Sequence, residues 1–273
     1  MTPPPAHATT VPPALAIERA GRVVVATLAR PPVNALDGDL VALLDALVGD
    51  VTANPDVAVL HIRSAGRVFC AGADLATMQR CLATPEGVAA MVDVVRRMQR
   101  LFARLEAAPV VTLAEIGGAA LGGGLELALA CDLRVAAQEA KLGLPEANLG
   151  LVPAAGGTQR LARLCGEGVA KRLILGAEVV DGAEAARLGV VQWARPRAEL
   201  AEWTRALAQR IAGMPKAALA ASKSCIAAAG VPSRDGYAEE IAASCALYES
   251  AETRDRVAKF LANRAKAQTR EKT

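Results

Sequence analysis

The spacing of apolar residues predicts strands that alternate with helices over the first half of the chain. Residues 15–29 hold two apolar runs, and we expect a pair of strands joined at Ala20-Gly21. Further short strands are predicted at 57–63, 109–114 and 133–137. From about Thr158 the pattern is almost entirely helical, apart from a short apolar run at 190–194. The pattern therefore favours an α/β core followed by a helical C-terminal part.

Three helices are predicted within the α/β part. The first begins near Asp37, whose side chain suits an N-cap, and places Leu40, Leu43, Leu44 and Leu47 on one face. The second covers about 86–105, where apolar residues recur at helical spacing: Met91, Val94, Val95, Met98, Leu101 and Phe102. The third follows the glycines at 122–124 and ends near Asp132.

The composition indicates a globular chain of balanced charge. With 273 residues, 53% of them hydrophobic, the chain can form one large domain with a substantial core. The net charge of +3 lacks the strong basic bias of a dedicated nucleic-acid-binding protein. No apolar run reaches the ~20 residues of a membrane-spanning helix. Residues 1–13, rich in Pro, Ala and Thr, are expected to be a disordered leader and not a secretory signal.

The cysteines and histidines form no recognisable metal motif. The six cysteines include no C-x-x-C pair, and the two histidines, His7 and His61, cannot make an H-E-x-x-H site. We therefore expect reduced, mostly buried thiols, no bound metal and a cytoplasmic location.

A single carboxylate, Glu126, interrupts the apolar run AALGGGLELALACD (119–132) before Asp132. The glycines before it leave backbone N–H groups unshielded at a helix start, where negative charge is favoured. A carboxylate in apolar surroundings has a raised pKa and can transfer protons. The alternative is that the glycines serve close packing and that Glu126 pairs with an arginine. No G-x-G-x-x-G, G-K-[ST] or G-x-S-x-G motif supports a nucleotide site or a serine hydrolase.

Two further stretches combine glycines with a carboxylate. In FCAGADL (69–75), Gly72 among small residues exposes backbone N–H groups, although Asp74 could simply cap the next helix. In LGLPEANLGLVPAAGGTQRL (142–161), Pro145 fixes the backbone beside Glu146. The alternative for Glu146 is a solvated loop residue, which its apolar neighbours disfavour.

These stretches, taken in order, resemble the enoyl-CoA hydratase/isomerase family of the crotonase superfamily. RPPVNAL (30–36) precedes the three, and the resemblance continues through 173–194 to AKFLANR (258–264), covering about residues 14–266. It implies an α/β fold in which ββα units form a spiral core, residues 14–200. It also implies a helical C-terminal region, residues 201–273, that packs over the site and mediates trimerisation. Such trimers usually pair into hexamers.

The resemblance also implies roles for individual residues. The backbone N–H groups of Ala73 and Gly123 would form an oxyanion hole for a thioester carbonyl, and Glu126 and Glu146 would be the catalytic carboxylates. Contacts to substrate and coenzyme A would come from Val33, Ala35, Ala71, Asp74, Leu75, Gly122, Phe260, Arg264 and Lys266. Departures from the family pattern are Gly117 in place of a frequent asparagine, a shorter 30–36 loop, and Asn263 where hydratases usually carry lysine.

Both glutamates together favour hydration of 2-enoyl-CoA thioesters, with Glu126 as base toward water and Glu146 as acid at C2. The two roles could be shared or reversed, because coupled carboxylates titrate as a pair. No metal or redox cofactor is expected, since coenzyme A belongs to the substrate. The alternatives are a Δ3-Δ2-enoyl-CoA isomerase, a catalytically silent scaffold, and RNA binding through Arg97, Arg100 and Arg104, the last disfavoured because a solvated helix face explains the arginines.

Overall fold

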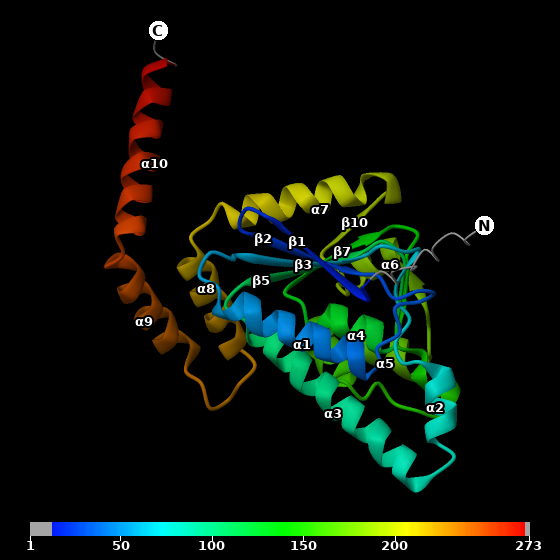
Figure 1. The fold of residues 1–273 in the computed structure, drawn as a ribbon. Helices are drawn as coiled ribbons and strands as arrows, with labels where there is room; N and C mark the ends of the chain where they lie inside the picture. The colour runs from blue at the N-terminus through cyan, green and yellow to red at the C-terminus, as the bar shows by residue number, and fades with distance from the viewer. Residues whose placement is uncertain (1–12, 271–273) are drawn as a thin grey trace, which may run out of the picture.

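A computed structural model describes residues 13–270, with side chains described as far as residue 264. The leader expected at 1–13 therefore lies almost wholly outside the described residues. The chain forms two β-sheets, packed with helices, and a helical arm at its C-terminal end (Figure 1).

The larger sheet has six strands in the order β1-β2-β3-β5-β7-β10. Its strands are β1 (Leu15–Ala20), β2 (Val23–Leu28), β3 (Val59–Ser64), β5 (Val111–Ile116), β7 (Leu133–Ala137) and β10 (Trp193–Arg195). Only β1 pairs antiparallel with its neighbour, and the other strands run parallel. Parallel pairing buries both faces, which explains why successive residues of β3 and β5 are buried without alternation. The strand pair expected within 15–29 is present.

The smaller sheet has four short strands in the order β4-β6-β8-β9. They are β4 (Val68–Cys70), β6 (Ala119–Leu121), β8 (Lys141–Gly143) and β9 (Val180–Asp181). The sequence pattern predicts none of these four strands, because strands of two or three residues are too short to show an alternation of apolar and polar positions.

The two sheets together make a spiral of ββα units. In three consecutive units the first strand enters the large sheet and the second enters the small one: β3 with β4, β5 with β6, and β7 with β8. A helix follows each pair, so the polypeptide returns to the next turn of the spiral. This is the architecture implied by the family resemblance.

Helices cover both faces of the large sheet (Figure 1). One face carries α7 (Arg197–Ala212), and the other side of the molecule holds α1 (Gly38–Ala53), α3 (Pro85–Ala107) and α4 (Gly123–Leu129). The remaining core helices are α2 (Leu75–Cys81), the 3-10 helix η1 (Pro145–Leu149), α5 (Gly157–Leu175) and α6 (Gly182–Arg187). Asp37 caps α1 as expected, since its side chain accepts from Leu40 N at 3.0 Å. A domain boundary after residue 200 would fall inside α7, which packs on the sheet.

The C-terminal arm consists of α8 (Lys216–Ala228), α9 (Gly236–Tyr248) and α10 (Ala251–Arg270). Helix α8 is tied to the core because Lys223 Nζ lies 2.8 Å from Asp132 Oδ2. Helix α10 packs mainly on α9 and projects away from the core, on the side opposite α2 (Figure 1). The expectation that this region packs over the site is therefore not met within one chain, because α10 does not fold back.

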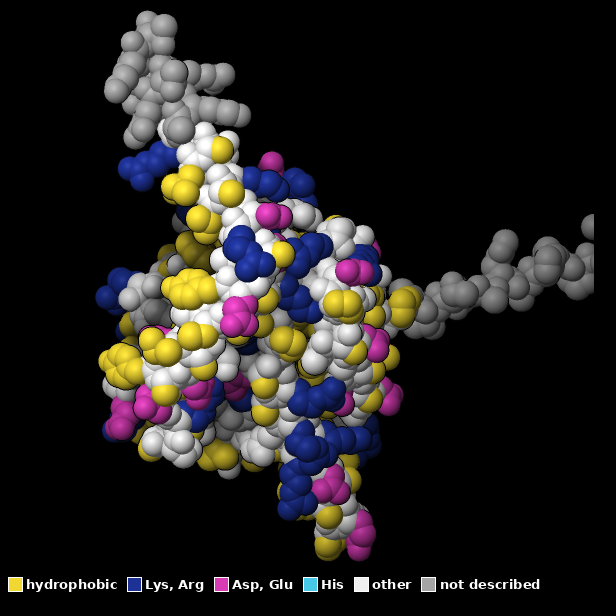
Figure 2. All heavy atoms as spheres, turned by 90° about the vertical axis from the view of Figure 1, so that its left-hand side faces the viewer, with side chains coloured by type: hydrophobic (Ala, Val, Ile, Leu, Met, Phe, Trp, Pro, Cys, Tyr) yellow, Lys and Arg dark blue, Asp and Glu magenta, His cyan; other side chains and the backbone are white. Residues whose placement is uncertain are grey.

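Apolar side chains gather on the outside of this arm. Figure 2 shows them along α9 and α10, and the strongly exposed ones are Tyr237, Ile241, Tyr248, Val257, Phe260 and Leu261. Among the described residues, no helix is long and apolar enough to cross a membrane.

Candidate functional site

Glu126 lies inside the protein on α4 and is only 3% exposed. Its Oε1 accepts a hydrogen bond of 2.7 Å from the backbone N–H of Gly157, the first residue of α5. Among the side chains described, residues 13–264, it forms no ion pair, so the alternative in which an arginine pairs with Glu126 is wrong. The buried carboxylate is therefore held by a backbone donor.

Burial raises the pKa of Glu126 from its ordinary 4.5 to about 7. Desolvation is the largest cause, since a buried site disfavours the charged form. The Gly157 N–H bond works in the opposite direction, and repulsion from Glu146 raises the pKa further. Glu126 therefore changes its protonation state near neutral pH, which suits a group that accepts and returns a proton.

Glu146 lies on η1, one residue after Pro145 fixes the start of that turn. Its side chain is half-buried, and burial raises its pKa above the ordinary value. Oε2 is buried without a hydrogen-bond partner among the described residues. A Cβ atom at Gly122 would lie 3.1 Å from Glu146 Oε1, so this carboxylate rests against the turn that begins α4. The carboxylate of Glu126, which belongs to α4, and that of Glu146, which comes from η1, therefore both lie at α4.

The expected backbone donors, Ala73 and Gly123, lie on adjoining segments. A Cβ atom at Gly72 would come within 3.0 Å of Gly123 N, so the two segments can only touch because residue 72 is glycine. Gly72 also has φ +87°, a conformation that favours glycine. Within the part of the chain that the structure describes, neither N–H donates a hydrogen bond to protein. Both donors are therefore available to an anion.

Asn34 joins the 30–36 loop to the segment that carries these donors. It is 5% exposed, and its Nδ2 donates to Val68 O, Phe69 O and Ser64 Oγ at 2.9–3.1 Å. Its Oδ1 accepts from Arg30 N at 2.8 Å. Two backbone bonds, Ala71 N to Val33 O and Leu36 N to Gly72 O, complete the connection. Asn34 thereby fixes the position of the donor loop.

Arg134 fixes the other end of α4. This side chain is 1% exposed and donates from Nη1 to Cys131 O at 2.6 Å and from Nε to Val190 O at 2.8 Å. A cation at a helix C-terminus satisfies carbonyl groups that have no partner within the helix. The helix that carries Glu126 is therefore held at its C-terminal end by a buried guanidinium group.

The sequence pattern predicts the glycines at 156 and 157 before a helix, but it predicts neither the roles of Asn34 and Arg134 nor the bond from Gly157 to Glu126. Asn34 lies within the RPPVNAL stretch, and its left-handed φ of 52° is a conformation that asparagine tolerates better than most residues. Arg134 stands in an otherwise apolar predicted strand, which was a usable signal. The contact of Gly157 with Glu126 joins residues far apart in sequence, so the spacing of apolar and polar residues does not indicate it.

Six of the nine residues expected to contact substrate lie in or beside the loops just described. Val33, Ala35, Ala71 and Gly122 all belong to the loops just described. Asp74 caps α2, because its Oδ1 accepts from Thr77 N at 3.0 Å, so the alternative of a capping role is confirmed. Leu75 begins α2 and is exposed.

The other three expected contact residues lie on α10 of the arm. Phe260 and Arg264 are exposed on α10, away from the glutamates of their own chain, and the side chain of Lys266 lies outside the described part. One chain therefore does not bring these residues to the site.

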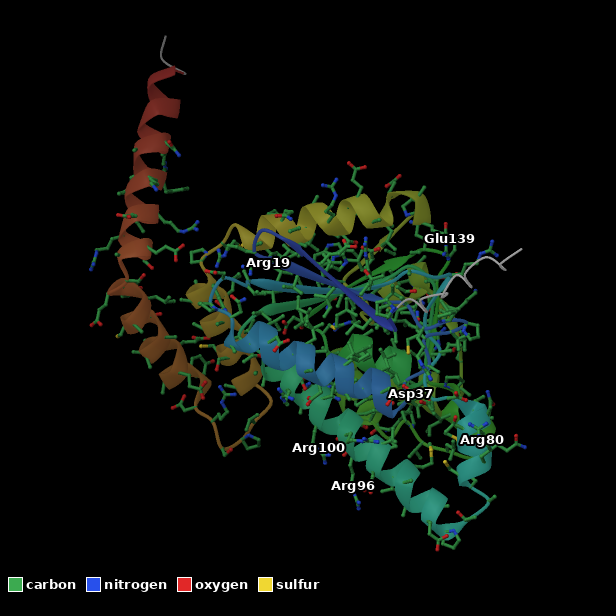
Figure 3. All side chains as sticks on the ribbon, viewed as in Figure 1. Arg19, Asp37, Arg80, Arg96, Arg100 and Glu139 are labelled. Carbon is green, nitrogen blue, oxygen red and sulfur yellow. The ribbon has the colours of Figure 1, made fainter. Side chains whose placement is uncertain are left out.

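Metal binding and RNA binding are the two other kinds of site that the sequence raised. In the described part of the chain, no three His, Cys, Asp or Glu side chains gather as metal ligands. Of the three arginines considered for RNA binding, Arg104 forms an ion pair with Asp45 of α1. Arg97 packs beside Gly38, and Figure 3 shows Arg100 pointing outward from α3. This is the arrangement of a solvated helix face.

Comparison with known proteins identifies relatives of this arrangement. A family model described as "Enoyl-CoA hydratase/isomerase" matches residues 18–266. A protein of Clostridium acetobutylicum named "Short-chain-enoyl-CoA hydratase" is 36% identical over 216 residues, which cover 77% of this chain and 79% of that one. A "Crotonyl-CoA hydratase" of Syntrophomonas wolfei is 38% identical over 209 residues, covering 76% and 78%.

Solved structures agree with the sequence comparison. The crystal structure of an enoyl-CoA hydratase from Bacillus anthracis superimposes with a TM-score of 0.84 at 32% identity, covering 93% of this chain and 97% of that one. The spiral of ββα units expected from the sequence is thereby confirmed as a crotonase-like fold. With this fold and a family match over most of its length, the chain belongs to the enoyl-CoA hydratase/isomerase family.

Proposed function

We propose that this protein is an enoyl-CoA hydratase, which adds water reversibly across the 2,3 double bond of 2-enoyl-CoA thioesters to give 3-hydroxyacyl-CoA. The observation that carries the proposal is the pairing of Glu126 and Glu146. Both carboxyl groups have raised pKa values, and both lie at the helix that begins with Gly123. Hydration needs one group that takes a proton from water and one that supplies a proton to carbon.

The backbone donors supply the electrostatic part of the reaction. When water attacks C3, the electron pair of the double bond moves to the thioester carbonyl oxygen, and an enolate forms. The N–H groups of Ala73 and Gly123, which donate to no protein acceptor among the described residues, are available to this oxygen. A fixed donor of this kind typically contributes about 3–4 kcal/mol to stabilising such a charge.

The two carboxylates move the protons. Ionised Glu126 removes a proton from the attacking water as the C3–O bond forms, and protonated Glu146 gives its proton to C2 as the enolate collapses. Because both carboxylates adjoin the start of α4, we propose that water and proton add to the same face of the double bond, a syn addition. After the reaction the two carboxyl groups still share one proton, which is now on Glu126. Proton exchange through the next water molecule returns the proton to Glu146 and restores the starting state.

These groups account for every bond change without a metal or redox cofactor, and we propose that none is needed. Coenzyme A enters as part of the thioester. The relatives named for short-chain and crotonyl substrates make crotonyl-CoA the first substrate to test.

Purified protein incubated with crotonyl-CoA tests the proposal. We expect a product heavier by one water, and in D2O the deuterium at C2 should lie on the same face as the new hydroxyl at C3. If neither crotonyl-CoA nor longer 2-enoyl-CoAs gain water, the proposal is wrong. If 3-enoyl-CoAs are converted to 2-enoyl-CoAs faster than hydration proceeds, the main activity is isomerisation.

We also propose that the chain assembles as a homotrimer, or as a hexamer of two trimers, through its C-terminal arm. The support is the row of exposed apolar side chains on α9 and α10, since apolar surface of this extent usually marks an interface. Phe260→Asp should give monomers in light scattering after size exclusion. Ile17→Asp, an exposed apolar residue on β1, is the matched control and should leave the oligomer intact. A wild-type monomer would contradict the proposal.

In such an oligomer we propose that Phe260 and Arg264 contact coenzyme A bound to a neighbouring subunit. The support is the direction of α10, which leads away from its own core (Figure 1). Glu126→Gln and Arg264→Glu chains, each weakly active alone, should form co-expressed mixed oligomers that regain activity. If mixed oligomers are no more active than either parent, the contact across subunits does not exist.

We further propose a cytoplasmic location. All six cysteines carry free thiols, and Cys70 and Cys131 are buried. Free thiols are typical of a reducing compartment. Fractionation of the source cells, with the protein in the cytoplasmic fraction, is the expected result.

A further inference from the structure

The backbone that holds Glu126 is itself held by side chains of α3 and α5. Gln99 Nε2 on α3 donates to Ala154 O at 2.6 Å, and Arg160 Nη1 on α5 donates to Ala155 O at 3.1 Å. The 154–157 turn ends at Gly157, whose N–H bonds to Glu126 Oε1. Two side chains from different helices therefore fix two successive carbonyl groups just before the donor of this bond.

Arg160 is clamped in place by a carboxylate. Its Nε and Nη2 both donate to Glu106 Oε2 on α3, at 3.1 and 3.0 Å, and the residue is only 7% exposed. A planar guanidinium group held on one edge presents its remaining nitrogen in a fixed direction. Here that nitrogen, Nη1, meets the Ala155 carbonyl.

The turn fits closely around both charged groups. Gly156 has φ +106°, and a Cβ atom there would lie 2.2 Å from Arg160 Nη1. A Cβ atom at Gly157 would lie 2.9 Å from Glu126 Oε1. The two glycines let the backbone run between the guanidinium and the carboxylate, where neither position has room for a side chain.

We propose that Arg160 is a positioning residue for the reaction: clamped by Glu106, it holds the Ala155 carbonyl so that the Gly157 N–H points at Glu126. The proposal rests on the proposed function of Glu126 as the base. The competing explanation is that the Arg160–Glu106 pair only joins α3 to α5.

The two explanations differ in their effect on the protonation of Glu126. Both the Gly157 N–H bond and the positive charge of Arg160 favour the ionised carboxylate, and both lower its pKa. Removal of Arg160 therefore moves the pKa of Glu126 further upward. A loss of helix packing alone lowers stability and leaves this pKa unchanged.

Arg163 provides a matched control. It lies one helical turn after Arg160 on α5 and also pairs with Glu106, through the other carboxylate oxygen. None of its hydrogen bonds goes to the 154–157 turn among the described residues. Arg163→Met thus weakens the link between α3 and α5 without releasing the turn.

The experiment compares Arg160→Met, Arg160→Lys and Arg163→Met, each checked for folding by circular dichroism and thermal unfolding. We expect Arg160→Met to lower kcat up to about 100-fold, with little change in KM, and to move the acidic limb of the kcat/KM profile to higher pH. Arg160→Lys keeps the positive charge but loses the planar guanidinium group that bonds Glu106 and Ala155 O at the same time. It should lower kcat while the limb shifts less than in Arg160→Met. Arg163→Met should match wild type in both readouts.

A direct titration of Glu126 by carbon-13 NMR of the side-chain carboxyl group separates this proposal from the proposed function. A higher pKa of Glu126 in folded Arg160→Lys, which keeps the positive charge but loses the bond geometry of the guanidinium group, supports the positioning role even if no hydration is found with any substrate. If folded Arg160→Met shows the kcat, the pH profile and the Glu126 pKa of Arg163→Met, Arg160 has no positioning role.

Discussion

Oε1 of Glu126 accepts a 2.7 Å hydrogen bond from the backbone N–H of Gly157, thirty-one residues further along the chain. The bond joins the helix that follows one glycine-rich stretch to the start of the helix that follows another. Through this bond, α4 and the start of α5 contribute to the same site. The behaviour of Glu126 in this position leads to several measurable consequences.

The first consequence concerns pH. Because burial raises the pKa of Glu126 to about 7, and the base must be ionised to accept a proton from water, kcat/KM should fall as pH falls through about 7. A pH series of kcat/KM with crotonyl-CoA measures this limb. A limb near the ordinary glutamate value of 4.5 would show that the carboxylate is solvated.

The second consequence concerns stability. The folded protein binds the Glu126 proton more tightly than the unfolded chain does, so the stability that this proton contributes is present below about pH 4.5 and is lost as pH rises to about 7. Glu126→Gln should therefore raise the free energy of unfolding at pH 8, by up to about 3 kcal/mol, and leave it almost unchanged at pH 4.5. Denaturant unfolding at both pH values tests this. A variant that is less stable than wild type at pH 8 would contradict it.

Gly72 should tolerate no side chain without loss of activity. A Cβ atom there would come within 3.0 Å of Gly123 N and Leu121 O, so Gly72→Ala should push the two donor segments apart and lower kcat by about 100-fold. Gly21→Ala is the control, since Gly21 has φ +64° but no atom within 4 Å of a Cβ. The control should lose about 1–2 kcal/mol of stability and no activity. Equal activity of the two variants would remove Gly72 from the site.

Asn34 should contribute to both stability and activity. Asn34→Ala removes the side-chain donor of the buried Phe69 carbonyl and leaves the Val68 carbonyl with Ser64 Oγ alone. We expect a loss of about 2–4 kcal/mol in the free energy of unfolding, with a reduced kcat in the protein that remains folded. Ser64→Ala removes one partner of Asn34 and should lose about 1 kcal/mol. An Asn34→Ala protein as stable as Ser64→Ala would show that the network is dispensable.

The sequence predicted those parts of the site that depend on neighbouring residues. Glycines next to a carboxylate within an apolar run are visible locally, and this drew attention to Glu126 and Glu146. The hydrogen bonds that orient them are not local: Gly157 reaches Glu126, and Arg160 reaches Glu106 across 54 positions. Apolar periodicity carries no information on which polar atoms meet in such pairs.

The fold was predictable to a similar extent. Long amphipathic segments such as α3 gave strong helical periodicity and appear close to the expected positions. The short strands β4, β6, β8 and β9 form only because the larger sheet has already brought their segments together. The direction of α10 could not be predicted either. Its apolar face is equally compatible with packing on the core of its own chain and with packing on another subunit.

In the proposed mechanism, Glu126 and Glu146 act as one pair that moves both protons of the hydration. Rates of crotonyl-CoA hydration by Glu126→Gln, Glu146→Gln and the double variant test it most directly. Each single substitution should lower kcat by several orders of magnitude, and the double variant should be hardly slower than the slower single variant, because either loss disables the pair. Losses that multiply in the double variant, or a single variant with near wild-type kcat, would contradict the account.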